Sequence, residues 1–376
     1  MFISSIISGG QRMFALSNEQ RKCLGLLPVE SSWILTEVKA IPYDDFKTYV
    51  YIDGTVIRKC ILSGIDKYVE YELCEQLSGD LRYLLPKTAK GKPVLLSSST
   101  LLKRSGFGMC LAYGKGYISL TNKTSMRTYY SSVYDPLNID NIGGFANWVL
   151  QWCADTSSED YEDIKRFSLQ ARKHVRYQEG DVFRFRINRR LYGYGRILLD
   201  YDKMRKKKEP FWDILMSKPL VCSVYHIATE NKHLTIDELE KLQSLPSTII
   251  TDNDLFYGNF EIIGNIPVCD HEDYPIMYGN SKNVREQAVV LQCGKLYCRI
   301  ENGSSIFKGF TNNGVGFSLN VKLPVLLQCI AEKSNAPFWS QENWASVKHD
   351  LRNPKFRTEL EQICKQFDLK LSQLIK

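Results

Sequence analysis

The densest set of side chains that could do chemistry is Cys269-Asp270-His271-Glu272-Asp273. Thiolate, imidazole and carboxylate groups are the usual protein ligands of divalent metals. Consecutive residues cannot all turn toward one ion, however, and no second pair with zinc spacing follows Cys293 and Cys298. We therefore expect an acidic loop here, with no bound metal and no other cofactor.

The sequence lacks the motifs of the common catalytic sites. No Gly-x-Ser-x-Gly elbow occurs, and no cysteine has the sequence context of a protease nucleophile. Neither Gly106-Phe107-Gly108 nor Gly193-Tyr194-Gly195 has the third glycine of a phosphate-binding loop. The zinc deaminase pattern is also absent. We therefore expect a binding protein and no enzymatic activity.

Cationic and aromatic side chains concentrate between residues 176 and 208, which hold eleven Lys and Arg and four Asp and Glu. Arginines interleaved with tyrosines on one hairpin, within residues 180–208, would suit a nucleic acid, with the rings as stacking platforms. The alternative is a solvated face, neutralised in part by acidic residues of the same domain. The candidate polyanion-binding residues are Arg184, Arg186, Arg189, Arg190, Tyr192 and Tyr194.

Two alternating segments must position these side chains. Residues 183–187 place Phe and Ile on one face and Arg on the other, and residues 191–199 alternate Leu, Gly and Ile with Tyr and Arg. This period of two predicts an antiparallel hairpin with one buried and one wet face, joined at residues 188–190. Gly193 and Gly195 on the inward face indicate close backbone approach or the sharp coiling of a small barrel.

The same hairpin carries a family resemblance. Gly180-Asp181-Val182-Phe183, followed by Tyr192-Gly193-Tyr194-Gly195-Arg196 and an aliphatic strand, resembles the opening of the Immunity protein 26 family. Residues 312–319, a Leu-rich helix and residues 335–339 are similar to the closing segment of these proteins. The resemblance spans about residues 176–376, and the first half of the chain resembles no family. It implies a bacterial polymorphic-toxin system, in which the protein binds and neutralises a cognate toxin without catalysis.

An acidic stretch becomes informative under this resemblance. From Asp252 to Asp273 the chain has six carboxylates and no Lys or Arg. If the toxin is a nuclease with a basic cleft, carboxylates could occupy the positions of phosphates, with aromatic residues as anchors. The alternative is an ordinary acidic loop. The candidate partner-binding residues are Asp252, Asp254, Phe256, Tyr257, Asp270, Glu272, Asp273 and Tyr274.

The length of 376 residues predicts two domains, which we place at 1–172, of unknown role, and 173–376. Strands and helices are segregated along the chain, which favours the α+β class. We expect a mixed N-terminal domain, then a coiled, barrel-like antiparallel sheet with C-terminal helices at 323–332, 342–351 and 357–375. Asp53-Gly54 predicts a hairpin turn and 142–153 a core-facing helix, whereas 69–85 fits a helix or a strand followed by a helix.

Three further features bear on location. No apolar run approaches the ~18 residues of a transmembrane helix, so we expect no contact with a membrane. Residues 1–9 lack a basic segment before their apolar residues, which argues against a signal peptide. The eleven cysteines have no framework spacing and fit reduced core thiols. We expect a cytoplasmic protein.

Overall fold

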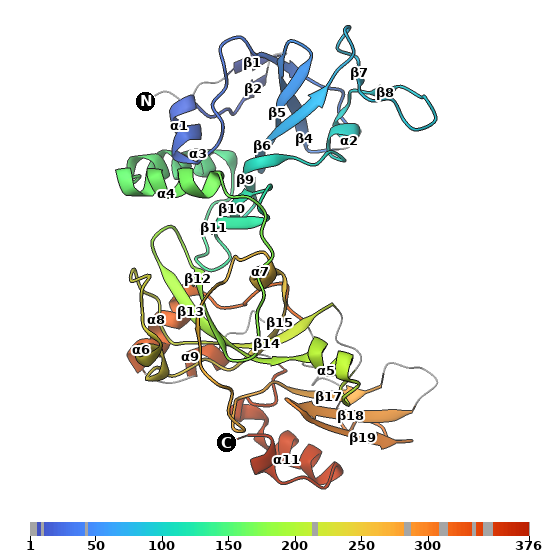
Figure 1. The fold of residues 1–376 in the computed structure, drawn as a ribbon, viewed down its shortest axis with the longest axis vertical. Coiled ribbons are helices and arrows are strands. Elements are labelled where there is room, and N and C mark those ends of the chain that lie inside the picture. The colour runs from blue at the N-terminus through green and yellow to red at the C-terminus, as the bar shows by residue number, and fades with distance from the viewer. Residues whose placement is uncertain are drawn as a thin grey trace. The chain divides into compact units, whose positions relative to one another are not determined.

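A computed structural model describes residues 6–8, 11–41, 44–212, 217–281, 287–307, 315–332, 336–340 and 349–375. The chain divides into two compact units, an N-terminal unit, Met1–Lys173, and a C-terminal unit, His174–Lys376. Both units combine antiparallel sheets with helices that do not alternate regularly with the strands (Figure 1). The predicted α+β class is confirmed.

A seven-stranded antiparallel sheet with strand order β11-β10-β9-β6-β5-β4-β3 forms the N-terminal unit. Its strands are β3 (Ile34–Glu37), β4 (Phe46–Asp53), β5 (Val56–Gly64), β6 (Lys67–Gln76), β9 (Phe107–Gly114), β10 (Tyr117–Asn122) and β11 (Arg127–Ser131). Two short ribbons accompany it, β1 (Ile6–Ser8) with β2 (Gln11–Met13), and β7 (Tyr83–Leu84) with β8 (Val94–Leu95). The helices are α1 (Asn18–Cys23), α2 (Ser98–Leu101), α3 (Ile142–Ala154) and α4 (Ser158–Ser168).

Two local predictions in this unit are confirmed. Asp53 pairs with Val56 across the β4–β5 turn, where Gly54 has the positive φ of 59° that favours glycine. Helix α3 begins after Asn141, whose side chain accepts a hydrogen bond from the backbone N–H of Gly144. The helix considered for residues 69–85 is wrong, because this stretch contains strands β6 and β7.

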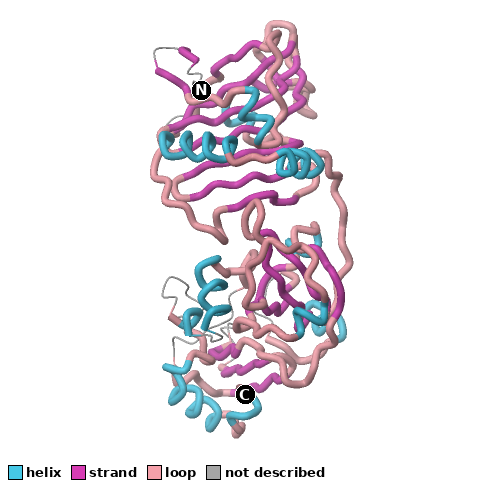
Figure 2. Tube along the Cα trace, turned by 90° about the vertical axis from the view of Figure 1, so that its left-hand side faces the viewer, coloured by secondary structure: helices cyan, strands magenta, loops and turns pink. Residues whose placement is uncertain are grey.

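Helices α3 and α4 cover one face of the seven-stranded sheet (Figure 2). Phe145 of α3 stacks on Tyr113 of β9 with ring centroids 4.7 Å apart, and Phe167 of α4 meets Tyr129 of β11 edge-on. A second apolar cluster, which includes Leu101 of α2, covers the opposite face. Both faces of the sheet are therefore buried, so its central strands do not show a simple alternation of apolar and polar residues.

A group of charged side chains lies inside the N-terminal unit. The Glu70 carboxylate of β6 is 2.7 Å from Arg21 Nε of α1 and 2.9 Å from Lys59 Nζ of β5, and the Tyr68 hydroxyl donates to it at 2.5 Å. Glu70 and Lys59 are fully buried. Burial by itself would raise the pKa of Glu70, but Lys59 and Arg21 lower this pKa to about 2. The ionised carboxylate offsets the cost of burying the two cations.

The C-terminal unit contains a five-stranded antiparallel sheet with order β15-β14-β13-β12-β16 and a three-stranded sheet with order β17-β18-β19. The strands are β12 (Asp181–Arg186), β13 (Tyr192–Asp200), β14 (Pro219–Val224), β15 (Thr248–Thr251), β16 (Glu261–Asn265), β17 (Ile276–Asn280), β18 (Ala288–Cys293) and β19 (Leu296–Glu301). The larger sheet is open, with edges at β15 and β16. Among the described residues no barrel closes, so the barrel-like part of the fold prediction is wrong.

Short helices complete the C-terminal unit. They are α5 (Tyr201–Lys207), α6 (Ile236–Glu240), α7 (Asn253–Phe256), α8 (Leu323–Glu332), α9 (Ala336–Trp339), η1 (Pro354–Phe356), α11 (Arg357–Gln366) and η2 (Leu371–Gln373). Leu360 and Ile363 of α11 pack on the sheet β17–β19 in one apolar cluster with Leu291. The helix predicted at 323–332 is confirmed and that at 357–375 is shorter. The prediction at 342–351 lies mostly outside the described residues.

Replacing Glu70 by Gln should destabilise the N-terminal unit, because Lys59 and Arg21 would remain buried without the carboxylate that they share. We expect a loss of about 3–5 kcal/mol at pH 7. The pKa of Glu70 is lower in the folded protein, about 2, than in the unfolded chain. The stabilisation is therefore present above the unfolded value of about 4.3 and disappears as the pH falls through about 2. Urea unfolding, monitored by hydrogen exchange at the amides of β5 and β6, measures the difference in the free energy of unfolding between the variant and the wild type.

A matched control is Glu37→Gln, which removes a pair with Lys47 whose two side chains are partly exposed. An exposed pair contributes about 0–1 kcal/mol, so this variant should unfold close to the wild type. Equal effects of the two substitutions, or a Glu70→Gln effect that does not shrink at acid pH, would contradict the role given to the buried carboxylate.

Candidate partner-binding surface

The predicted hairpin forms as β12–β13. Phe183 pairs with Gly195 and Phe185 with Gly193, and a Cβ atom added to either glycine would overlap the opposite phenylalanine ring. Phe183 also stacks on Phe260 at 4.9 Å. The two glycines therefore leave room for aromatic rings that lie directly on the backbone of the neighbouring strand.

The other face of this hairpin was expected to be wet, and this expectation is wrong. Tyr194 is fully buried and Tyr192 nearly so, in a cluster with Tyr225 and with Leu239 of α6. The Tyr194 hydroxyl donates to the backbone oxygen of Asn231 at 2.6 Å. Because residues beyond β14 cover this face, neither ring is open for stacking by a nucleic-acid base.

The arginines of the hairpin make contacts inside the C-terminal unit. Arg184 Nη2 lies 2.6 Å from Glu261 Oε2 of β16, and its guanidinium lies over the Tyr192 ring. Arg186 donates to the backbone oxygen of Arg189 at 2.8 Å and lies over the same ring. Arg190 is exposed in the connection. The structure thus gives Arg184 and Arg186 structural contacts, and no observation favours the polyanion-binding alternative.

The candidate residues around α7 are mostly shielded from solvent. Asp252 is buried and accepts a hydrogen bond from the Tyr177 hydroxyl at 2.9 Å. Asp254 accepts from the Asn259 amide at 2.8 Å, and burial raises the pKa of Asp254. The Phe256 ring stacks on His174 at 4.3 Å, and Tyr257 meets Phe256 edge-on. These contacts hold the start of the C-terminal unit against α7.

The remaining candidates lie in the acidic loop, which we define as residues 269–274, immediately before β17. Glu272 forms an ion pair with Arg196 of β13 and accepts a hydrogen bond from its own loop at Cys269. Asp273 accepts from the Ser247 backbone N–H at 2.9 Å, and its side chain is 50% exposed. Asp270 is exposed, and Tyr274 is half-buried. The acidic loop is therefore held by the contacts of Glu272 and Asp273, whereas Asp270 is open to solvent.

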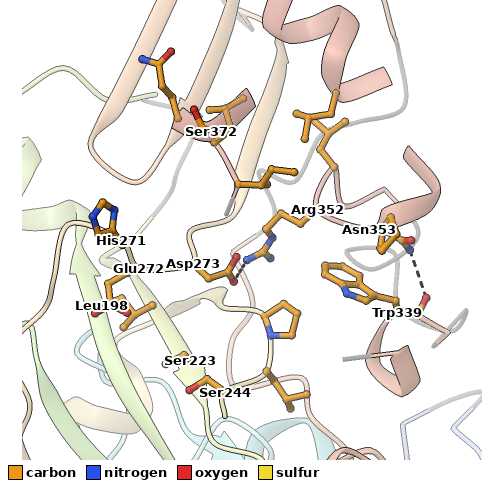
Figure 3. A pocket seen from close by; sticks show the side chains of 18 of the residues that line it. Leu198, Ser223, Ser244, His271, Glu272, Asp273, Trp339, Arg352, Asn353 and Ser372 are labelled. Carbon is orange, nitrogen blue, oxygen red and sulfur yellow. Dashed lines mark hydrogen bonds and ion pairs between the residues drawn. The ribbon is translucent and has the colours of Figure 1, made fainter. Parts of the chain in front are cut away.

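A cavity of about 680 Å³ lies beside the acidic loop (Figure 3). One wall comes from Leu198, Ser223 and the segment 244–246, and another from Trp339 and the segment 351–354. A second cavity, of about 490 Å³, is also lined by residues of the loop and shares Asp270 and Glu272 with the first. The loop thus contributes to the lining of two cavities of the C-terminal unit.

Sequence reasoning missed Arg352, a buried residue that forms an ion pair with Asp273 of the acidic loop. Its Nη1 atom is 2.5 Å from Asp273 Oδ2, across a separation of 79 residues. A dashed line in Figure 3 joins Asp273 to Arg352. No local motif surrounds Arg352, and the sequence contains 49 Lys and Arg residues, so nothing in the pattern distinguishes this one.

Two kinds of feature are absent from the described residues. These residues contain no group of three or more His, Cys, Asp or Glu side chains that could hold a metal ion. None of their helices combines the length and the apolar character that crossing a bilayer requires.

Comparison with protein families gives one match. Residues 178–288 match the family model of Immunity protein 26, which confirms the suspected resemblance over this segment. The segment contains the hairpin, every candidate partner-binding residue and the acidic loop. Residues 312–319 and 335–339, which the sequence analysis also compared with this family, lie outside it. Neither the curated proteins nor the solved structures give a match to the chain.

Alanine at Gly193 should destabilise the C-terminal unit, because its Cβ atom would overlap the Phe185 ring. Overpacking of this kind costs about 1–3 kcal/mol, which urea unfolding would measure. Gly114→Ala, in strand β9, is the control, since nothing lies within 4 Å of the added atom. Phe185→Leu should reduce the cost of Gly193→Ala in a double-mutant cycle. Strictly additive effects would show that the ring and the glycine do not interact.

Proposed function

We propose that this protein is a bacterial immunity protein, which binds a cognate protein toxin and neutralises it without catalysis. The observation that carries the proposal is the match of residues 178–288 to Immunity protein 26. The matched segment forms the larger sheet and the acidic loop, so the resemblance covers the part of the C-terminal unit where exposed carboxylates adjoin a cavity. The N-terminal unit lies outside the match.

The acidic loop is the part of this segment that best suits a partner. Asp270 is exposed and Asp273 is half-exposed, whereas Asp252 is buried and paired within the unit. Carboxylates also outnumber cations around the loop. Among the described residues that line the two cavities and their ion-pair partners there are six carboxylates and four cations. They are Glu179, Asp270, Glu272, Asp273, Asp350 and Glu361, against Arg196, Lys295, Arg352 and Arg357. A surplus of negative charge attracts a basic surface and speeds the encounter with it.

Masking is the mechanism that this arrangement supports. A toxin that acts on nucleic acid would have a basic cleft, and the acidic loop could enter such a cleft while the adjoining cavity accepts a side chain from the toxin. Trp339 in the cavity wall is an aromatic residue of the kind that anchors interfaces. An interface of standard size, about 1,600 Å², would cover a toxin active site. In this proposal the immunity protein acts in the cytoplasm of the toxin-producing cell.

Co-purification of the full chain with the polypeptide encoded by the neighbouring gene tests the proposal. We expect a one-to-one complex that survives moderate salt and abolishes the toxicity of the neighbour. Absence of any complex, together with retention of nucleic acid that falls steeply with salt, would refute the immunity function and support the polyanion alternative.

Charge reversal on the acidic loop tests whether this loop contacts the toxin in that complex. Asp270→Lys should weaken binding by on the order of tenfold, chiefly through a slower association rate, because a rim charge steers the encounter. Surface plasmon resonance at two salt concentrations measures both rates. Glu230→Lys is the control, since Glu230 is an exposed carboxylate of the same segment that lines neither cavity. Equal effects of the two variants would move the interface away from the acidic loop.

A further inference from the structure

Arg352 joins three separate segments of the C-terminal unit. Its Nε and Nη2 atoms donate to the two oxygens of Asp350 at 3.0 and 2.7 Å. Nη2 also donates to the backbone oxygen of Ser247 at 2.8 Å, and Nη1 donates to Ser247 Oγ at 3.2 Å and to Asp273 Oδ2 at 2.5 Å. One guanidinium therefore ties the segment before β15 and the acidic loop to the C-terminal segment.

Every N–H group of this guanidinium has an acceptor within the protein. The Arg352 side chain is only 5% exposed, and its carbon ζ lies 6.0 Å from the centre of the Trp339 ring. Burial alone would lower the pKa of Arg352, but Asp273 and Asp350 outweigh burial and raise this pKa above its ordinary value. Arg352 therefore stays charged and has no donor left for a ligand, so its function is to hold the surrounding segments.

The held segments form the walls of the cavity. Ser244, Leu245 and Pro246 precede Ser247 on one wall, while Asp270 and His271 belong to the loop that Asp273 fixes. Ser247 and Asp273 also bond directly, because the Ser247 N–H donates to Asp273 Oδ2. Residues 244–247 and the acidic loop both belong to the family-matched segment, whereas Arg352 lies 64 residues beyond its end at 288.

We infer that Arg352 is the positioning residue of the partner-binding surface, and that the binding module of this protein extends past the family-matched segment to the C-terminal segment that carries Arg352. The inference rests on the proposed function. A loop held in its binding geometry does not have to be ordered when the partner arrives, so the complex avoids an entropic cost. Arg352 would thus raise the affinity for the toxin without touching it.

Variants of the full-length protein test this inference against the co-purified neighbour polypeptide. Arg352→Met removes the charge and the hydrogen bonds, and Arg352→Lys keeps the charge but cannot bridge three segments at once. Ordering two or three side chains on binding costs roughly tenfold in affinity, so we expect about tenfold weaker binding for Met and a several-fold loss for Lys. Arg299→Met is the control, because its pair with Glu301 on β19 lines neither cavity.

Hydrogen exchange at the Ser247 amide provides a second readout that needs no toxin. This amide donates to the Asp273 side chain and not to a strand neighbour. Its protection from exchange therefore reports on the contacts among Ser247, Asp273 and Arg352. We expect faster exchange at Ser247 in Arg352→Lys, with unchanged protection in β17 and β18. Unchanged exchange at Ser247 would overturn the inference, as would wild-type affinity in Arg352→Lys, which would show that charge alone suffices. If Arg352→Met does not fold, the Lys variant decides by itself.

The outcomes also separate this inference from the proposed function. Failure of the wild-type protein to bind the neighbour polypeptide refutes the immunity function, whatever happens at Ser247. Binding by the wild type and equal binding by both Arg352 variants preserves the immunity function and refutes the positioning role.

Discussion

A guanidinium or ammonium group inside a protein costs several kcal/mol unless carboxylates and backbone oxygens surround it. Both units of this protein use that constraint to hold distant segments together. In the N-terminal unit Glu70 gathers Arg21 and Lys59 between α1 and two strands of the sheet. In the C-terminal unit Arg352 gathers Asp273 and Asp350. In each cluster, displacing a carboxylate would leave a buried cation without its partner, so the contacts constrain the segments that carry these residues.

The hydrogen bonds and ion pairs of Arg352 explain how a polar loop can be both ordered and accessible. Asp273 uses one oxygen for Arg352 and for the Ser247 amide, yet half of its side chain still meets solvent. Asp270, three residues earlier, is exposed beside the cavity. The interior contacts therefore fix the backbone of the acidic loop while leaving negative charge at the surface, which is what an interface for a basic partner needs.

The hairpin has a different role from the one its composition indicated. Its rings and glycines interlock on one face, and its tyrosines are buried on the other, so it serves as the centre of the larger sheet. Its basic residues partly neutralise acidic residues of the same unit, as the Arg184–Glu261 and Arg196–Glu272 pairs show. The arginines of strands β12 and β13 are thus engaged in contacts within the unit, whereas Arg190 and the basic residues of α5 are exposed. The exposed carboxylates of the acidic loop remain available to a partner.

Local patterns in the sequence determined the elements that depend on neighbours along the chain. The alternation around Phe183 and Phe185 predicted the hairpin, Asp53-Gly54 predicted a turn, and the aromatic spacing at 142–153 predicted helix α3. The resemblance carried by the hairpin residues also pointed to the family that residues 178–288 match.

Only the tertiary structure decided which surfaces are exposed. An alternating strand shows that two faces differ, but whether the second face is wet depends on a segment elsewhere, and here Tyr225 and Leu239 cover Tyr192 and Tyr194. The same holds for charge. Glu272 and Arg196 are 76 residues apart, and Asp273 and Arg352 are 79 apart, so their pairing leaves no periodic signal. The acidic run was visible in the sequence, whereas its division into paired and exposed carboxylates required the folded chain.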